Sequence, residues 1–274
     1  MAKNEGFMGS GRDLLKRLLS RTTTASFRHW LRRYYLSRVV VRRSYRPERE
    51  IEVLKWLLSP GDFVADIGAN IGTYAMELAS LVGTRGQVFC FEPVAENYDI
   101  LTTVIRRARL PNIQSFYVAL GSRVGKVEMV IPDFGGFMGF YLAHIARSGE
   151  RGRRELVDVM ALDTLWRDKT ISRLHFIKCD VEGSELEVIR GGLELIRAHR
   201  PGWLIEVGRA TSRDVFDLMT NLGYRSFVYA DTLVPTAGYR DKEFSNYFFL
   251  HPKSAMWAHL VPHVTGMTSA ECVS

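Results

Sequence analysis

From Pro47 onward the chain alternates short apolar runs with amphipathic helical patterns, and this alternation most constrains the fold. The apolar runs predict strands at 63–67, 88–91, 113–120, 126–131, 174–180, 203–207, 225–229 and 246–250, and the spacing of apolar residues between them predicts helices at 47–58, 71–82, 95–109, 184–198 and 212–222. Strands that alternate with helices pair mostly in parallel and are covered on both faces. The sequence therefore predicts an α/β fold with a doubly wound, mostly parallel sheet, whose ligands lie beyond the carboxyl ends of the strands.

Residues 132–156 interrupt the alternation. Glycine and aromatic residues are concentrated at 134–141, and a charged stretch follows them. A loop of this length is either a lid that closes over a substrate or a disordered insertion, and both interpretations stay open. The predicted organisation is a basic, aromatic-containing extension over 1–46, an α/β domain over 47–251 that includes this variable loop, and a tail over 252–274.

Positive charge is concentrated at the N-terminus. Residues 1–50 contain 13 Lys and Arg against 4 acidic residues, whereas residues 51–274 contain 24 against 26. Between Phe27 and Arg46 the arginines alternate with aromatic and aliphatic residues, a pattern typical of segments that contact an anionic membrane or nucleic acid. The interpretation we favour is a basic helix packed on the α/β domain with solvated arginines.

Neither a membrane span nor a secretory signal is expected. No apolar run approaches the roughly 18 residues that cross a bilayer, and the first 30 residues lack the apolar core of a signal peptide. Cys90 and Cys179 lie in strand-like runs, and no CxxC spacing is present. The sequence predicts a cytoplasmic protein, and peripheral contact of residues 27–46 with the inner face of the membrane is kept as an alternative.

A glycine-rich turn follows the first predicted strand. Gly68 lets the backbone approach a ligand closely, Gly72 allows tight helix packing, and Asn70 is expected to cap the next helix. The spacing differs from the dinucleotide motif, and the acid two residues before Gly68 suits a ligand with cationic ammonium and sulfonium groups. The candidate ligand-binding residues of this turn are Asp66, Gly68, Ala69, Asn70, Gly72 and Thr73. A purely structural strand-to-helix turn is the alternative.

A second acid ends the next predicted strand. Glu92, followed by Pro93, lies 20 residues after Gly72, where a carboxylate can accept both ribose hydroxyls of a nucleoside. Ala119 and Leu120, at the end of the third predicted strand, are expected to flank the adenine. Together with the glycine turn, these residues predict a nucleoside-containing ligand.

A cluster of charged residues follows the fourth and fifth parallel strands. Period-two alternation puts Lys178 and Asp180 on one face, with Glu182 at the start of the next helix and Glu206 at the end of the following strand. We expect the three carboxylates to converge on one pocket mouth, where one of them can remove a proton from an alcohol while its neighbours position the substrate. Two alternatives remain: Asp180 and Glu182 cap the helix while Lys178 neutralises them, or Asp180 and Glu206 share a divalent cation.

The chain resembles the FkbM family of methyltransferases. The matching segments are DIGANIGTYAMELA (66–79), VFCFEPVAENYDIL (88–101), ALG (119–121), VDVMALDTL (157–165), FIKCDVEGSELEVIRGG (176–192) and RPGWLIEVG (200–208). The resemblance implies a class I fold of seven strands that uses S-adenosylmethionine (SAM) and methylates hydroxyl groups. It also implies that Asp66, Gly68, Asn70, Gly72, Glu92 and Asn97 bind SAM. Residues before 47 and the loop 132–156 lie outside the resemblance, so it does not extend to the acceptor.

The leading hypothesis is a SAM-dependent O-methyltransferase that acts on a sugar hydroxyl of a glycan, glycolipid or glycosylated metabolite, with Asp180, Glu182, Glu206 and Lys178 as the catalytic candidates and no metal. Two alternatives are a nucleic-acid methyltransferase and a non-catalytic SAM-binding or membrane-attached protein. The first is weakened because Asp180-Val181-Glu182-Gly183 stands where such enzymes have an Asn/Asp-Pro-Pro-Tyr/Phe signature. The sequence does not determine the oligomeric state.

Overall fold

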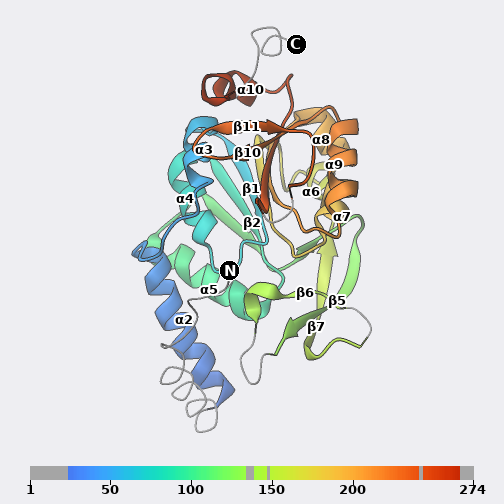
Figure 1. The fold of residues 1–274 in the computed structure, drawn as a ribbon. Helices are drawn as coiled ribbons and strands as arrows, with labels where there is room; N and C mark the ends of the chain where they lie inside the picture. Colours follow the sequence, from blue (N-terminus) through green and yellow to red (C-terminus); the bar gives the residue numbers. More distant parts are fainter. Residues whose placement is uncertain (1–23, 134–138, 147–148, 241–242, 266–274) are drawn as a thin grey trace, which may run out of the picture.

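A large sheet forms the centre of the molecule. The computed structural model describes residues 24–133, 139–146, 149–240 and 243–265. The strand order is β11-β10-β12-β9-β8-β1-β2-β3 (Figure 1). The bounds are β1 Phe63–Ile67, β2 Gln87–Phe91, β3 Ile113–Phe116, β8 Phe176–Cys179, β9 Gly202–Glu206, β10 Arg225–Tyr229, β11 Leu233–Thr236 and β12 Asn246–Leu250. Strands β3, β2, β1, β8 and β9 pair in parallel, and the remaining pairs are antiparallel. The predicted mostly parallel α/β sheet is confirmed, with eight strands instead of seven because β11 extends the edge.

Helices cover both faces of this sheet (Figure 1). They are α3 Ile51–Leu57, α4 Thr73–Val82, α5 Ala95–Ala108, α6 Leu162–Arg167, α7 Glu185–Arg190, α8 Leu193–His199, α9 Ser212–Asn221 and α10 Ala255–Leu260, the last followed by the short helix η2 Val261–His263. Alternate residues of β1 enter different cores: Val64 packs with side chains of α3, α4 and α10, whereas Ala65 and Ile67 pack with those of α6 to α9. The two cores hold the parallel strands rigidly, so their carboxyl ends provide a fixed frame for a site.

Two predicted elements are divided in the structure. The strand predicted over 113–120 ends at Phe116, and β4 (Ala119–Leu120) belongs to a second sheet. The helix predicted over 184–198 is interrupted at Gly191 and Gly192, which separate α7 from α8. A Cβ on Gly191 would lie 2.0 Å from the carbonyl oxygen of Gly121, so the glycine lets these two segments come into contact.

The second sheet has four strands in the order β4-β7-β5-β6, with β5 Gly125–Pro132, β6 His144–Ile145 and β7 Gly152–Met160, and the short helix η1 (Phe140–Leu142) precedes β6. The prediction of an irregular loop over 132–156 is therefore wrong for η1, β6 and the start of β7. Opposite charges on the exposed face stabilise the β5–β7 pair, since Lys126 binds Asp158 at 2.6 Å and Arg154 binds Glu128. Residues 134–138 and 147–148 of the predicted loop lie outside the described residues.

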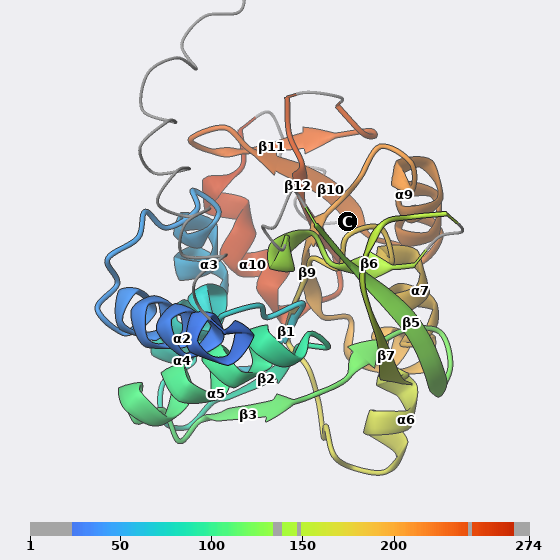
Figure 2. The same cartoon turned by 90° about the horizontal axis from the view of Figure 1, so that it is seen from below.

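The basic N-terminal segment contains helix α2 (Ala25–Val41), which lies along α5 (Figure 2). The Thr24 hydroxyl oxygen accepts a hydrogen bond from the Phe27 amide at 3.2 Å and caps the helix. The favoured interpretation is confirmed for the packing of this helix on the α/β domain, but its expectation of solvated arginines is wrong for Arg32 and Arg33, which bond to side chains of α5. Among the residues that the structure describes, no helix is both long and apolar enough to span a bilayer.

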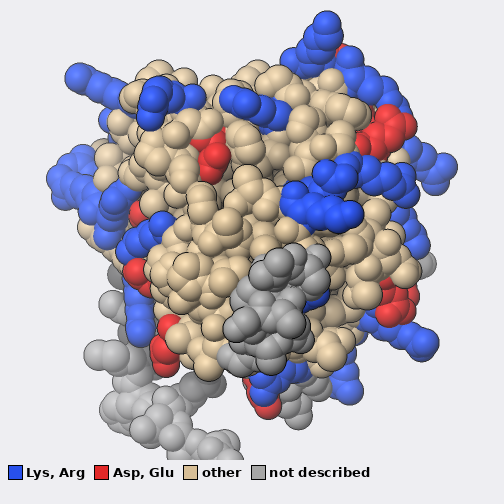
Figure 3. All heavy atoms as spheres, turned by 90° about the horizontal axis from the view of Figure 1, so that it is seen from above, with Lys and Arg blue, Asp and Glu red and all other residues tan. Residues whose placement is uncertain are grey.

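Basic side chains also occur far from this segment. At the end of the molecule where α10 lies, Lys and Arg surround a largely uncharged centre (Figure 3). Within the described ranges, the buried charged side chains are Asp66, Glu92, Asp163 and Glu185 against Lys178. Because more acids than bases are buried, the surface outside the N-terminal segment is more basic than the sequence count indicates.

Candidate active site

The turn after β1 depends on left-handed backbone conformations. Gly68, Asn70 and Gly72 have φ angles of 75°, 51° and 92°. A Cβ on Gly68 would lie 1.8 Å from the Asp180 carbonyl oxygen, so glycine allows the ends of β1 and β8 to meet. The expected capping by Asn70 is wrong: helix α4 begins at Thr73 with Gly72 as its N-cap, and the Asn70 side-chain oxygen is buried without a partner among the described groups.

Glu92 holds the glycine turn after β1 against the segment that follows β2. Its carboxylate accepts hydrogen bonds from the Asn70 and Val94 amides, both at 2.8 Å, and the residue is 4% exposed. Burial raises the pKa of Glu92 to about 7, although these bonds and one from Asn97 lower it. Each carboxylate oxygen has a second lone pair, so Glu92 can still accept hydroxyl donors.

A buried ion-pair chain lies beneath the turn. Lys178 and Asp66 are partners in the β1–β8 register, and the Lys178 ammonium lies 3.7 Å from Asp66, 3.2 Å from the Asp180 carboxylate and 3.2 Å from the Gly68 carbonyl oxygen. Burial raises the pKa of Asp66 to about 6 despite the nearby ammonium. Burial lowers the pKa of Lys178, but the charges of Asp180 and Asp66 outweigh it, so the net shift is upward. Asp66 is fully buried, and the Lys178 ammonium lies between it and Asp180, which borders the pocket.

A pocket of about 660 Å³, open to solvent, lies beyond the carboxyl ends of β1, β2 and β8. The predicted site residues that line it are Gly68, Asn70, Glu92, Pro93, Asn97, Ala119, Leu120, Asp180 and Glu182, and those that do not line it are Asp66, Ala69, Gly72, Thr73, Lys178 and Glu206. Its further lining residues include Phe91, Val118, Met129, Phe140, Tyr141, Ala143, Ile145, Val181 and Ser184. The second sheet and η1 therefore supply a wall that the strand-end motifs did not predict.

Acidic side chains gather on one side of the pocket. Burial raises the pKa of Glu182, and the charges of Asp180 and Glu185 add to this shift. Burial, followed by the charges of Asp180 and Glu182, raises the pKa of Glu206 to about 7. Glu206 thus lies within electrostatic range of the pocket, although it is outside the lining. Within the described part of the chain, no group of three or more His, Cys, Asp or Glu is placed to hold a metal ion.

The helix-capping alternative for Asp180 and Glu182 is wrong. Ser184 is the N-cap of α7 and makes no side-chain capping bond. Instead the buried Glu185, which the sequence analysis did not single out, accepts a hydrogen bond from the Gly183 amide at 2.9 Å. The carboxylates of Asp180 and Glu182 therefore remain available on the pocket side. Glu185 could have been noticed in the sequence, because it is an acid in the first turn of a predicted helix.

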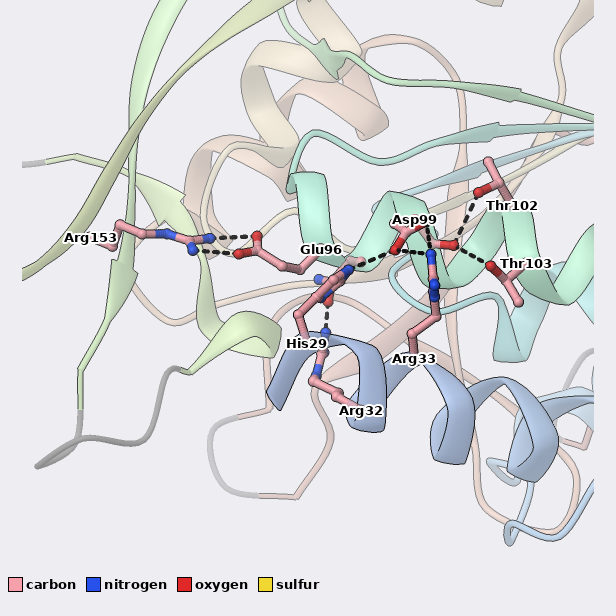
Figure 4. A network of polar contacts seen from close by, with 9 residues as sticks. His29, Arg32, Arg33, Glu96, Asp99, Thr102, Thr103 and Arg153 are labelled. Atoms are coloured by element: carbon pink, nitrogen blue, oxygen red, sulfur yellow. Dashed lines mark hydrogen bonds and ion pairs between the residues drawn. The ribbon is translucent and has the colours of Figure 1, made fainter. Parts of the chain in front are cut away.

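Helix α2 supports the pocket wall from behind through Arg32, which the sequence analysis also missed and which contacts two lining residues. The Arg32 guanidinium donates to the Asn97 side-chain oxygen at 2.8 Å and lies 4.3 Å from the centre of the Phe140 ring. The Asn97 amide group in turn donates to the Phe140 carbonyl at 3.1 Å. Figure 4 shows the surrounding contacts, in which His29 and Arg33 of α2 reach Asp99 of α5. These contacts tie α2, α5 and η1 together beside the pocket.

Comparison with known proteins identifies the family. The methyltransferase FkbM domain matches residues 66–226, which is more than half of the chain. The chain belongs to the FkbM methyltransferase family. A curated relative is the hexuronic acid methyltransferase AglP of Haloferax volcanii, 30% identical over 150 residues that cover 52% of this chain and 56% of AglP. The chain thus matches about half the length of this curated relative.

Solved structures of similar fold include other methyltransferases. The FkbM methyltransferase of Methylobacillus flagellatus KT is 23% identical with a TM-score of 0.49, and the match covers 70% of this chain and 44% of that one. A SAM-dependent methyltransferase from Aquifex aeolicus is 15% identical with a TM-score of 0.42, and the match covers 76% of this chain and 94% of that one.

Proposed function

We propose that this FkbM chain transfers a methyl group from SAM to a sugar hydroxyl in a glycan, glycolipid or glycosylated metabolite. The observation that carries the proposal is a single pocket that joins Glu92 and Asn70 on one side to Asp180 and Glu182 on the other. Membership of the FkbM family supports methyl transfer, and the name of the relative AglP supports a sugar as acceptor.

The side chains on the glycine-turn side of the pocket fit SAM. The free lone pairs of Glu92 are suited to the two ribose hydroxyls, and Ala119 and Leu120 supply an apolar wall for adenine. The unpartnered side-chain oxygen of Asn70 is an acceptor for the ammonium of the methionine part. When bound, SAM supplies an electrophilic methyl group on a positively charged sulfur.

On the other side, Asp180 is our candidate for the proton acceptor. It lines the pocket and is held by Lys178 at 3.2 Å, so its carboxylate has a fixed direction. The acceptor oxygen would bond to the methyl carbon as the carbon–sulfur bond breaks and releases the neutral thioether, while the hydroxyl proton passes to the Asp180 carboxylate and then to solvent. Glu182 and Glu206 would accept hydrogen bonds from neighbouring sugar hydroxyls and so orient the acceptor.

The wall formed by η1 supports a sugar acceptor. Phe140 and Tyr141 line the pocket, and aromatic rings bind the apolar faces of sugars. The other aromatic residues that the sequence analysis assigned to such stacking lie within 134–138, outside the described residues. The acceptor contact is therefore proposed for Phe140 and Tyr141 alone.

The direct test combines a binding and a transfer measurement. We expect S-adenosylhomocysteine (SAH) to bind by isothermal titration calorimetry, and the tritiated methyl of SAM to appear on a hexoside or hexuronide but not on an oligonucleotide. A chain that binds no SAH would end the SAM assignment. Transfer to the oligonucleotide alone would replace the sugar acceptor with nucleic acid.

SAH binding is expected to strengthen with pH through the titration of Glu92. Because burial raises the pKa of Glu92 to about 7, its carboxyl is mostly protonated at pH 6 and mostly ionised at pH 8. The ionised form accepts both ribose hydroxyls, so the Kd of SAH should be about tenfold weaker at pH 6 than at pH 8. Glu92→Gln should bind more weakly and lose this pH dependence. An unchanged slope in the variant would show that another group controls binding.

A further inference from the structure

The first turns of helix α2 pack on the domain through polar side chains, whereas Leu36, Val40 and Val41 near its end pack in a buried apolar cluster. His29, Arg32 and Arg33 form hydrogen bonds with side chains of α5, and Ser37 accepts one from Arg107 at 3.0 Å. These α2 residues recur at spacings of three and four and so lie on one face of the helix. Surface helices ordinarily turn their apolar stripe inward, so the polar packing face over the first turns of α2 is unusual.

The opposite face of α2 is apolar and exposed. Its five large side chains are each 41% to 64% exposed: Phe27, Trp30, Leu31, Tyr34 and Tyr35. They recur at i, i+3, i+4, i+7 and i+8 and form one outward stripe. We call these five residues the outward stripe. A contiguous exposed apolar surface of this kind marks a site of interaction with a partner or a membrane.

The charge of the helix points to an anionic partner. The segment Ala25–Val41 contains four arginines and no acidic residue. Arg38 extends the outward stripe by one turn and donates to the Tyr34 hydroxyl at 2.7 Å, and Arg42 follows it as an exposed residue. Apolar and cationic groups therefore share the exposed side, as they do in helices that lie on anionic bilayers.

The aromatic rings are arranged for a membrane surface rather than for nucleic-acid bases. The Trp30 ring already stacks on two neighbouring rings, Phe27 at 5.8 Å and Tyr34 at 5.7 Å between centroids. The guanidinium groups of Arg38 and Arg107 lie 5.0 Å and 5.7 Å from the Tyr34 ring centre. Single-stranded nucleic acids bind by stacking bases on open ring faces, whereas interfacial aromatic residues need exposed edges.

We propose that the outward stripe binds an anionic phospholipid bilayer. Helix α2 lies in the plane of the headgroups, with its aromatic edges at the boundary of the acyl chains and with Arg38 and Arg42 near lipid phosphates. Arg32 on the same helix contacts Asn97 and Phe140, so a docked α2 places the pocket wall beside the bilayer. If the proposed function holds, this placement favours an acceptor sugar that is attached to a lipid.

The test measures co-sedimentation of the full chain with phosphatidylcholine vesicles that contain or lack phosphatidylglycerol. We expect binding to the anionic vesicles and at least about tenfold weaker partitioning for the double variant Phe27→Glu/Trp30→Glu, because each charge near such a surface changes partitioning about fivefold. Leu156→Glu is the matched control, since Leu156 is 68% exposed on β7, and it should bind like the wild type. Tyr35→Glu, which leaves the ring stack intact, should also weaken binding.

Several results would overturn the proposal. They are equal binding to both vesicle types, no binding by the wild type, or unchanged binding by both stripe variants. Trp30-dependent binding of a single-stranded oligonucleotide without vesicle binding would assign the surface to nucleic acid instead. Melting curves and SAH titration of each variant verify folding. A chain that binds anionic vesicles but not SAH would contradict the proposed function and leave this inference standing.

Discussion

Replacing Asp180 with Asn is expected to lower kcat for methyl transfer by about 10²- to 10⁴-fold, the usual contribution of a positioned proton acceptor. The asparagine keeps the size of the side chain but cannot take the proton of the acceptor hydroxyl. Because Asp180 lines the pocket on the side that we propose for the acceptor, the Kd of SAH should change less than about threefold. Steady-state kinetics and calorimetry on the same preparation measure both quantities.

The control for this variant is Glu187→Gln on α7. Glu187 pairs with Arg190 at 2.8 Å and does not line the pocket, so its neutralisation should leave kcat unchanged. Wild-type kcat in Asp180→Asn would move the role of proton acceptor to Glu182 or Glu206. Equal losses in kcat and SAH affinity would instead indicate a collapse of the pocket, because Asp180 also neutralises Lys178.

Replacing Gly68 with Ala is expected to destabilise the protein by about 2–5 kcal/mol. An alanine there must adopt a φ of 75°, and its Cβ would lie 1.8 Å from a backbone oxygen of Asp180. The left-handed conformation costs about 1–2 kcal/mol, and forced backbone displacement adds about 1–3 kcal/mol. Because β1 and β8 would separate where the pocket begins, SAH binding should be lost as well. Urea denaturation and calorimetry measure the two effects.

Gly183→Ala separates conformational strain from steric overlap. Gly183 also has a left-handed φ, 97°, but a Cβ at this position meets no atom within 4 Å. Its substitution should therefore cost only about 1–2 kcal/mol. If the two variants lost the same stability, the close approach of Gly68 to Asp180 would not matter for folding.

The strand-end residues could be predicted because parallel strands place their carboxyl ends at one edge. Gly68, Glu92 and Asp180 are far apart in the sequence, yet each follows an apolar run, and the structure brings them to one pocket. Alternation along β8 correctly placed Lys178 and Asp180 together. The sequence did not indicate which of these residues are buried. Asp66 belongs to the same motif as Gly68, but it is fully buried because its face of β1 packs against α4.

The rest of the pocket depends on contacts that local patterns do not encode. An apolar run over 113–120 does not reveal that β3 and β4 join different sheets, since both ends are equally strand-like. Arg32 lies in a segment with many arginines, and its contact with Asn97 depends on how α2 packs on α5. The charged residues at the start of β7 are typical of a loop in the sequence. In the structure they form a strand, because charged residues of β5 pair with those of β7.

The small sheet has a consequence for how acceptor preference evolves. The chain leaves the end of β4 at Gly121 and returns to it at Met160, and these two residues are joined by a backbone hydrogen bond of 2.9 Å. Because the two ends are neighbours, a relative's segment of different length or composition can replace residues 121–160 without displacing either end. Chimeric chains made at this junction would exchange the Phe140 and Tyr141 wall while retaining Glu92 and Gly68. Because Gly121 and Met160 are adjacent, we expect relatives to differ in the segment between them, and so in the acceptor, while they keep the same large sheet.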